Sequence, residues 1–421
     1  MKTAVRLIAV LTALVLVSAA TSATLAGPTR VSVSSTNEEG DRPSFAGSIS
    51  ASGRFVAFTS QATNLVPDDT NERQDAFVYD RRTGSTERVS VTSSGAQARP
   101  GEDSFGGSAA LGMSADGRYV LFRSDAPNLA ASKSEADAFI RDRTATRTRR
   151  IPVLGLQVIA GAMSQDGRYA VVEAGGNVYR YSLHSRHVTR LTAKANSWSA
   201  DPAVSADGRY VAFTSNASNL VPGDTNKLPD VFVRDVQTGK TTRVSVTSAG
   251  KQGVGKLDSN GSNAPVLSPD GRYVAFHSDM TNLVPGDTNK VFDIFVHDRV
   301  TGKTQRVSVS SSGQQADQES LSGASFSADD RFLAFTSLAT NLVANDHNEI
   351  TDVFIRDLRA GNTRLASLGV NGQGDDASFV GGGSSAFTRN SRYLLFASWA
   401  GNLVPGDTNG VADVFVRDLR Q

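Results

Sequence analysis

The sequence contains no cysteine, and it has only 2 tryptophans and 4 methionines in 421 residues. The absence of cysteine excludes a disulfide framework, a thiolate nucleophile and a lipid anchor attached through a cysteine. Common catalytic signatures are missing as well, since neither Gly-x-Ser-x-Gly nor His-Glu-x-x-His occurs. No short motif therefore identifies an enzyme.

An excess of charge of either sign is also missing. The chain has 43 Lys and Arg residues and 42 Asp and Glu residues, a formal net charge of +1. The first 26 residues contain Lys2 and Arg6 and no acid, so the rest of the chain has 41 cations, 42 anions and a net charge of −1. We therefore expect neither nucleic acid nor an anionic membrane as a partner, because both are bound by basic surfaces.

The N-terminus has the pattern of a secretory signal. Lys2 and Arg6 supply a positive start, residues 7–17 an apolar run, and residues 24–26 a small-residue cleavage site. The apolar run is too short to span a bilayer comfortably. We predict that residues 1–26 are a signal peptide cleaved after Ala26, with Ala20 or Ala23 as rival sites and an uncleaved anchor as the alternative. The mature, soluble chain would then be exported to the periplasm or the extracellular space.

What the sequence has in abundance is glycine, 38 residues in all, and one repeated phrase, Ser-x-Asp-Gly-Arg-Tyr. Asp-Gly between two apolar runs predicts a tight two-residue hairpin turn, because these residues tolerate positive φ. Each phrase should therefore join two strands. Seven versions occur, at residues 52–55, 116–119, 166–169, 207–210, 270–273, 329–332 and 390–393.

The fourth unit shows what each repeat is expected to build. After its turn, residues 210–213 are apolar on both faces, as in a strand covered on two sides. Residues 230–235 form a third strand, and residues 242–246 alternate apolar with polar like a half-exposed outer strand. Four antiparallel strands per unit make a propeller blade. The seven units predict an all-β, seven-bladed β-propeller that spans residues 27–421 as one domain.

The last unit has no fourth strand of its own, because the chain ends directly after a third strand at residues 415–421. Residues 29–33, Thr-Arg-Val-Ser-Val, match the fourth strands at residues 88–91 and 306–309 and precede every complete blade. We expect this N-terminal strand to complete the last blade. It would close the ring and remove the exposed edges of an open array.

On these residues the chain resembles the TolB-like, or WD40-like (PD40), β-propeller repeat family, whose signature is Ser-Pro-Asp-Gly-Lys/Arg. Residues 268–272 match the signature in full, and residues 205–209 and 114–118 differ from it only at the proline. The resemblance covers residues 29–421 and implies a rigid protein-binding platform. Some relatives attach peptidase domains, but the chain has neither length for a hydrolase domain nor the extra N-terminal domain of TolB. The resemblance thus concerns fold more than function.

Most units exceed the about 40–45 residues that a blade needs. The surplus lies between the second and third strands and between the outer strand and the next blade. In an up-and-down blade these two connections emerge on one face, opposite the short hairpins. We expect function on this loop-rich face.

Five loops between second and third strands carry the spacing Asp-x-Asn-x-x-x-Asp. Clustered oxygen ligands suit Ca²⁺, which takes six to eight of them. Asn and Asp equally cap turns by bonding nearby backbone amides, so both interpretations stay open. The candidate calcium ligands are Asp69, Asn71, Asp75, Asp224, Asn226, Asp230, Asp287, Asn289, Asp293, Asp346, Asn348, Asp352, Asp407, Asn409 and Asp413.

Blades two and three depart from this pattern. Residues 132–134 have lost it, and blade three keeps only residues 175–177 between its strands. The gap that results in the rim either admits a ligand or reflects neutral decay of one copy. Acids also recur in the connections that enter the blades, where they either ring the pore and attract a cationic partner or are simply solvated. These acids are Asp41, Asp103, Asp258, Asp317 and Asp376.

Two functions follow from different features. The first is a monomeric, exported, non-enzymatic binding protein whose loop-rich face recognises an envelope or extracellular protein or a glycan, with Ca²⁺ stiffening the rim. The second is a secreted carbohydrate-active enzyme, a glycoside hydrolase or lyase, that works at the pore with carboxylates that break the repeat. A purely structural module is the third possibility. The carboxylates that break the repeat are Glu102, Glu135, Asp201 and Glu319.

Overall fold

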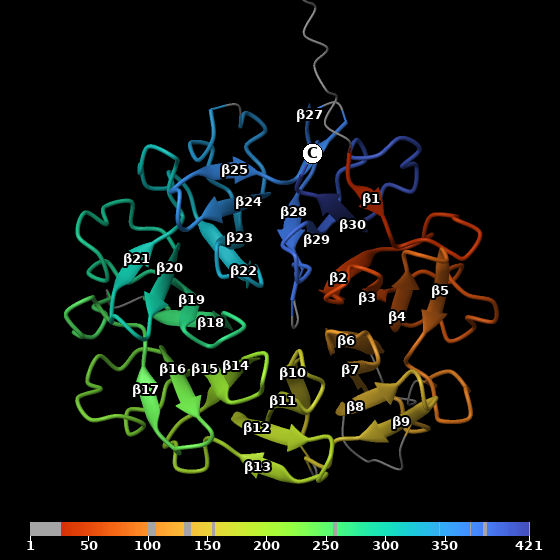
Figure 1. Cartoon of the computed structure of the whole chain (residues 1–421), viewed down its shortest axis with the longest axis horizontal. Coiled ribbons are helices and arrows are strands. Elements are labelled where there is room, and N and C mark those ends of the chain that lie inside the picture. Colours follow the sequence, from red (N-terminus) through yellow and green to blue (C-terminus); the bar gives the residue numbers. More distant parts are fainter. Residues whose placement is uncertain are drawn as a thin grey trace, which may run out of the picture.

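Seven four-stranded antiparallel sheets surround a central axis like the blades of a propeller (Figure 1). This computed structural model describes residues 27–99, 107–129, 136–153, 156–255, 259–344, 346–370, 372–381 and 385–420. The predicted signal peptide at residues 1–26 lies outside them. Within the described ranges there is no helix, which confirms the prediction of an all-β, seven-bladed propeller.

The strands follow the chain from the axis outward in six of the blades. Blade one contains β2 (Ser44–Ile49), β3 (Phe55–Ser60), β4 (Asp75–Asp80) and β5 (Ser85–Arg88), and blade two β6 (Ser108–Met113), β7 (Tyr119–Ser124), β8 (Asp137–Asp142) and β9 (Arg147–Arg150). Blade three contains β10 (Val158–Met163), β11 (Tyr169–Ala174), β12 (Asn177–Ser182) and β13 (Val188–Arg190), and blade four β14 (Ser199–Val204), β15 (Tyr210–Ser215), β16 (Asp230–Asp235) and β17 (Thr241–Arg243).

The remaining blades are built in the same way. Blade five contains β18 (Ser262–Leu267), β19 (Tyr273–Ser278), β20 (Asp293–Asp298) and β21 (Thr304–Arg306), and blade six β22 (Ser320–Phe326), β23 (Phe332–Ser337), β24 (Asp352–Asp357) and β25 (Thr363–Leu365). Blade seven contains β28 (Ser378–Val380), β29 (Tyr393–Ser398), β30 (Asp413–Asp418) and β1 (Thr29–Arg30). A two-stranded hairpin of β26 (Leu368–Gly369) and β27 (Gly372–Gln373) precedes it.

The core consists of the second and third strands, which are covered on both faces by the neighbouring blades. In every blade except the third, each of these two strands contributes one fully buried phenylalanine, and the two rings stack with centroids 5.4–5.9 Å apart. Such aromatic pairs stabilise beyond their buried area. The repeated core explains why the apolar runs on both sides of the Asp-Gly phrase predicted these strands correctly.

The prediction of a two-residue turn at Asp-Gly is wrong. In blade five the turn runs over residues 268–272 and is closed by hydrogen bonds from Ser268 N to Tyr273 O and from Gly271 N to Ser268 O, 2.9 and 2.8 Å long. Only the glycine has positive φ, 72°. Asp270 instead accepts hydrogen bonds from the Ser268 hydroxyl and the Arg272 amide. The aspartate therefore caps a longer turn, as Asn and Asp side chains commonly do.

The N-terminal strand closes the ring as predicted. β1 pairs antiparallel with β30, Thr29 opposite Val416 and Arg30 opposite Phe415, and the ladder continues through a 2.8 Å hydrogen bond from Val31 N to Val414 O. Figure 1 shows β1 beside β30 in blade seven. These hydrogen bonds join β1 to β30 and complete the fourth strand of blade seven. The ring is therefore closed within one sheet, which avoids the exposed edges of an open array.

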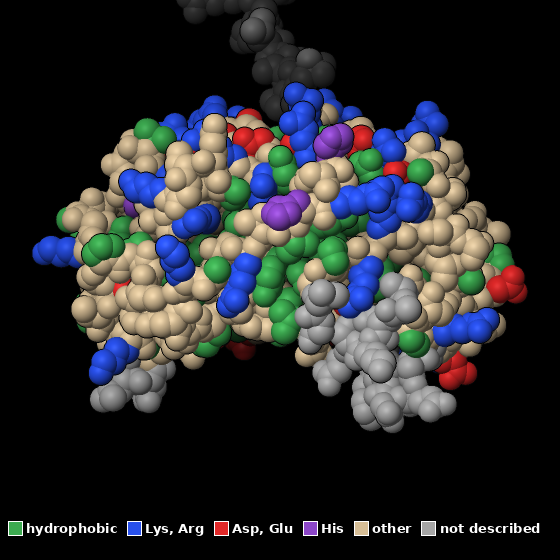
Figure 2. Space-filling view, turned by 90° about the horizontal axis from the view of Figure 1, so that it is seen from below, with side chains coloured by type: hydrophobic (Ala, Val, Ile, Leu, Met, Phe, Trp, Pro, Cys, Tyr) green, Lys and Arg blue, Asp and Glu red, His purple; other side chains and the backbone are tan. Residues whose placement is uncertain are grey.

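The long loops and the connections between blades lie on one face, also as predicted. Asn282, in the second loop of blade five, donates a hydrogen bond from Nδ2 to the carbonyl oxygen of Gln252 in the connection from blade four (3.1 Å). Asn341 and Asn402 make the corresponding bonds to Gln315 and Gln373. Figure 2 views the ring from its edge, so that this loop face and the hairpin face bound the molecule on opposite sides.

Candidate functional site

Each Asp-x-Asn loop is held by side chains of its own blade and by the connection to the next blade. In blade four, Asn226 Nδ2 donates to Asp230 Oδ2 (3.1 Å) and to the carbonyl oxygen of Gly253 (3.3 Å). Asp230 also accepts a hydrogen bond from the Ser245 hydroxyl. These partners satisfy a carboxylate that is fully buried at the start of β16, as buried polar groups require.

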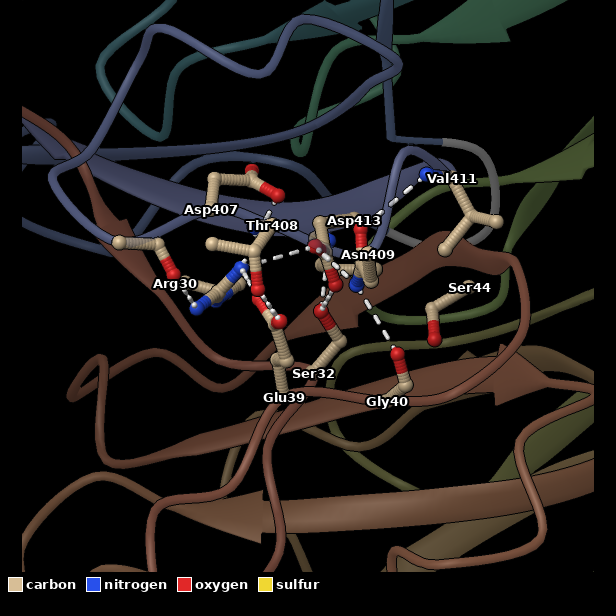
Figure 3. Close-up of polar contacts among 12 residues, drawn as sticks. Arg30, Ser32, Glu39, Gly40, Ser44, Asp407, Thr408, Asn409, Val411 and Asp413 are labelled. Carbon is tan, nitrogen blue, oxygen red and sulfur yellow. Dashed lines mark hydrogen bonds and ion pairs between the residues drawn. The ribbon is translucent and has the colours of Figure 1, made fainter.

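An arginine of the fourth strand neutralises the two acids of the loop in four blades. In blade four, Arg243 Nη1 lies 3.1 Å from Asp224 Oδ1 and 3.0 Å from Asp230 Oδ2. In blade seven the arginine is Arg30, which also pairs with Glu39 (Figure 3). The corresponding arginines are Arg88 in blade one and Arg306 in blade five. In these blades the motif ties the loop to the outer strand.

Blade six lacks this arginine. Leu365 pairs with Phe354 in the register that places Arg243 opposite Phe232 in blade four. No Lys or Arg within the described ranges forms an ion pair with Asp346 or Asp352, which accept hydrogen bonds from Gln373 and Asn348, both 2.9 Å long. Burial raises the pKa of Asp352 to about 6, and the charge of Asp346 adds to the shift.

Calcium binding at the five loops stays a prediction. The described residues include no group of three or more His, Asp or Glu side chains arranged to hold a metal ion. Four loops already contain a protein cation between their acids, whereas the acids of blade six do not. The prediction therefore narrows to Asp346, Asn348 and Asp352.

Replacing Leu365 with Arg should stabilise the protein above pH 6. An acid whose pKa is raised on folding disfavours the folded state as the pH increases, here between about pH 4, the pKa in the unfolded chain, and about pH 6 in the folded chain. A guanidinium at position 365 would compensate this charge. We expect a gain of about 1–3 kcal/mol at pH 8 and little change at pH 4, measured by urea unfolding at both pH values.

Leu365→Met is the matched control, since it keeps the apolar contact and adds no charge; it should stay within about 1 kcal/mol of the original at both pH values. Melting with Ca²⁺ and with chelator then tests the ion. If blade six binds Ca²⁺, the original protein gains melting temperature and Leu365→Arg does not. A melting temperature of the original protein that changes neither with Ca²⁺ nor with chelator would contradict calcium binding.

Blade three lacks the loop that the other blades carry between their second and third strands. β11 ends at Ala174 and β12 begins at Asn177, so Gly175 and Gly176 alone form the turn, with φ of 55° and 68°. Positive φ at two successive residues is the reason that both are glycine. The rim of the loop face is interrupted at this point.

A tryptophan lies next to this interruption. Trp198 directly precedes β14, and its Cβ lies 3.4 Å from the position of a Cβ built on Gly176. Two other blades have Gly107 or Gly261 at the place of Trp198, where a Cβ would come within 2.4 or 2.3 Å of a carbonyl oxygen. Trp198 is 43% exposed, which is unusual for so large an apolar side chain.

Two acidic residues that break the repeat, Glu173 and Asp201, lie in the seam between blades three and four. Glu173 Oε2, on β11, accepts a 3.1 Å hydrogen bond from the backbone nitrogen of Asp201. Asp201 lies in the bulge of β14 with φ of 50°, and its Oδ2 accepts a 3.1 Å bond from the Thr214 hydroxyl. Burial raises the pKa of Glu173, and Asp201 adds to the shift. Asp201 itself is exposed.

We call this region the blade-three gap and define it by Ile159, Glu173, Gly175, Gly176, Trp198 and Asp201. Ile159 lies in the bulge of β10, opposite the segment of β11 that holds Glu173, and is 53% exposed. The gap thus combines two exposed apolar side chains with two carboxylates. Exposed apolar residues rimmed by polar groups typically mark interaction sites.

The structure places the other predicted residues apart from the gap. Glu319 directly precedes β22 in blade six, while Glu102, Glu135, Asp103, Asp258 and residues 132–134 lie outside the described ranges. Asp41 and Asp317 accept hydrogen bonds from Thr63 and Thr340 in the loops of their own blades. These two acids brace loops.

A small cavity lies among the inner strands of blades three to seven. Its volume is about 30 Å³, and its lining includes Ala162, Ala203, Val266, Phe326 and Ser385. That volume suits about one water molecule, whereas ligand pockets usually measure about 300–1,000 Å³. The cavity is therefore much smaller than a usual ligand pocket.

Sequence reasoning found the missing loop and Asp201 but missed Trp198, Glu173 and Ile159. One signal was present, because Trp198 is one of only 2 tryptophans in the chain. Glu173 also stands where the second strands of blades one, four and six have Thr59, Thr214 and Thr336. These threonines accept backbone hydrogen bonds from the next blade just as Glu173 does.

Fold and site together define a seven-bladed β-propeller with an interrupted loop face. No family model matches the chain, and no curated protein matches its sequence. No helix in the described ranges is long and apolar enough to cross a membrane.

Solved structures resemble the chain at low sequence identity. A protein assigned as TolB from Agrobacterium tumefaciens is 15% identical over 81% of this chain and 96% of that one, with a TM-score of 0.44. TolB from Acinetobacter baumannii is 15% identical over 88% and 81%, with a TM-score of 0.39. An oligogalacturonate lyase in complex with manganese is 14% identical over 73% and 87%, with a TM-score of 0.43. Likenesses of this size concern the architecture alone.

Proposed function

We propose that the protein is an exported binding protein of the TolB-like (PD40) repeat type, which holds a protein or glycan of the envelope or extracellular space in the blade-three gap. The exposure of Trp198 beside a missing loop carries the proposal. Tryptophans that become buried when a partner binds supply much of the affinity of many interfaces. Asp201, exposed in the same seam, adds a charged group for specificity.

The two tryptophans of the chain make a direct test. Trp399 is 38% exposed next to β29, also on the loop face but in blade seven, so it is the matched control for Trp198. Trp399→Phe leaves Trp198 as the only indole, and Trp198→Phe does the reverse. We expect titration with the fractionated envelope proteins and glycans of the host to change the fluorescence of Trp399→Phe and leave that of Trp198→Phe unchanged.

Affinity provides the second measurement. Trp198→Ala should weaken binding of any ligand found in this way by at least about tenfold, as expected for a central aromatic contact. Trp399→Ala should retain it. Equal losses in both variants, or a fluorescence change confined to Trp399, would contradict a site in the gap.

The Glu173–Asp201 pair favours one alternative, a carbohydrate-active enzyme. Burial raises the pKa of Glu173, and the backbone of Asp201 lies in hydrogen-bond contact with it; two acids in one seam, one of them with a raised pKa, are what a glycosidase uses as its acid and its partner. Asp201→Asn distinguishes the two proposals. A binding protein shows no turnover of polysaccharides before or after the change, whereas an enzyme loses turnover in Asp201→Asn while it still binds its substrate.

A further inference from the structure

The outer edge of blades two and three carries an excess of positive charge that the balanced whole chain conceals. Residues 141–194 contain ten Lys and Arg residues and three acids, an excess of seven, although the full chain has 43 cations and 42 anions. The cations are Arg141, Arg143, Arg147, Arg149, Arg150, Arg168, Arg180, Arg186, Arg190 and Lys194. We call the surface they share the basic edge.

The excess in blade three arises from lost acids. In the six other blades the third strand begins and ends with aspartate, whereas β12 begins with Asn177 and ends with Ser182. Each of those terminal aspartates except Asp352 in blade six forms an ion pair with an arginine of the same blade. Blade three has kept the two arginines, Arg168 and Arg190, and has replaced both acids.

The first of these arginines has consequently lost the partner that its counterparts have. In the other blades the arginine of the repeated phrase pairs with the last aspartate of the third strand, as Arg272 does with Asp298 at 2.7 Å, and its side chain is 34–45% exposed. Among the residues that the structure describes, Arg168 forms one ion pair, with Asp166 at 3.6 Å, and its side chain is 74% exposed. Its charge therefore faces solvent.

The second arginine is bound by a neutral group. Arg190 donates from Nε and Nη2 to Asn177 Oδ1, at 3.0 and 2.7 Å, where its counterparts meet a carboxylate. Arg147, Arg186 and Lys194 are exposed and form no ion pair with any acid in the described ranges. Two cations of the edge are neutralised, Arg143 by Glu87 and Arg150 by Asp137. Its uncompensated positive charge therefore comes from the others, above all Arg147, Arg186 and Lys194.

Figure 2 looks onto this part of the ring. Lys and Arg side chains are spread over the whole height of the edge, on both sides of the exposed histidines, while Asp and Glu appear mainly at the margins. β9 and β13, which carry several of these arginines, are the outer strands of neighbouring blades (Figure 1). The cations therefore form a band that crosses two blades.

We propose that the basic edge binds a linear polyanion, a polymer that carries phosphate or carboxylate groups along its length. Most of the cations are arginines, whose planar guanidinium suits bidentate bonding to both groups. Their spread over two blades fits a chain with repeated charges rather than one small anion. The edge is convex (Figure 1), so a flexible polymer can follow it, whereas a flat bilayer would touch it along a narrow line. This inference is independent of the blade-three gap.

Polyphosphate and polygalacturonate are the probes, because they separate the phosphate source from the carboxylate source. The test variant is the triple change Arg147→Glu, Arg186→Glu and Lys194→Glu. The matched control, Lys240→Glu, Lys251→Glu and Lys303→Glu, changes the same total charge at exposed positions of blades four and five. Unaltered melting temperatures establish that both variants are folded.

We expect at least one probe to bind the original protein with an affinity that falls as salt increases. In the test variant the affinity at low salt should fall at least about tenfold, and the slope of log K against log salt should decrease by about 2, roughly 0.7 for each lost contact. The control should stay within about threefold. Equal losses in test and control variants, no binding of either polymer, or binding to anionic vesicles alone would overturn the proposal.

A single substitution provides a second test in case the triple variant fails to fold. Ser182→Asp restores the acid that pairs with the arginine of the repeated phrase in the six other blades. The new carboxylate should form an ion pair with Arg168. The melting temperature should stay unchanged or rise, and polyanion binding should weaken about two- to fivefold. Unchanged binding in Ser182→Asp would remove Arg168 from the site.

Discussion

Arg30→Ala should cost the protein about 3–5 kcal/mol of folding free energy, because it leaves buried carboxylates without their cation. Arg30 Nη1 lies 2.8 Å from Glu39 Oε2 and 3.2 Å from both Asp407 Oδ1 and Asp413 Oδ2 (Figure 3). The last two side chains are 3% and 1% exposed. The melting temperature should fall by roughly 4–6 °C, measured by calorimetry and checked by urea unfolding.

The effect also tests ring closure, since Arg30 belongs to the strand that joins the two ends of the chain. Arg42→Ala is the control: this arginine is exposed, forms no ion pair in the described ranges, and should change stability by less than about 0.5 kcal/mol. Burial raises the pKa of Asp407 to about 6, so the loss in Arg30→Ala should shrink below that pH as the acid becomes neutral. A loss no larger than that of Arg42→Ala would contradict closure through Arg30.

Gly208→Ala should destabilise the protein by about 2–4 kcal/mol. A Cβ at this position would lie 2.2 Å from Cδ2 and 2.8 Å from Cγ of Tyr169 in the preceding blade. The ring is half-buried in the seam between the blades and cannot withdraw without moving its neighbours. Positive φ, here 74°, adds about 1 kcal/mol of backbone strain for any residue with a side chain.

Gly239→Ala separates the two causes, because it lies in the same blade with a φ of 73° and has only the end of Arg234 near its Cβ, at 3.6 Å. It should lose only the strain of about 1 kcal/mol. Chemical unfolding of the two variants at one pH measures the difference. Equal losses would show that the contact with Tyr169 costs nothing and that only the backbone matters.

The repeat determined the fold in advance for a local reason. Each unit contains its own turn signals and its own buried strands, so the same prediction was made seven times from residues close in sequence. Closure was predictable because residues 29–33 match the fourth strands. The turn type was not, because Asp-Gly allows several turns and the contacts of Ser268 and Asp270 decide between them.

The Asp-x-Asn loops show where local reasoning ended. Their spacing suited both calcium and turn capping, and only the fold brings the arginine of the fourth strand between the two acids. Arg243 lies 13 residues beyond Asp230 in sequence and 3.0 Å from it in space. Leu365 is recognised as the exception only when its position in β25 is compared with those of the arginines in the other blades.

The sequence by itself determined the all-β propeller, its seven blades, its closing strand and the interruption at blade three, because each of these depends on patterns within about one repeat. Only the tertiary structure brought Trp198 to Gly176 and Asp201 to Glu173, since each pair joins two blades. The excess of cations in residues 141–194 can be read from the sequence, but only the structure shows which of them form ion pairs with acids. Contacts between blades depend on where the ring places each strand, and no local pattern records that placement.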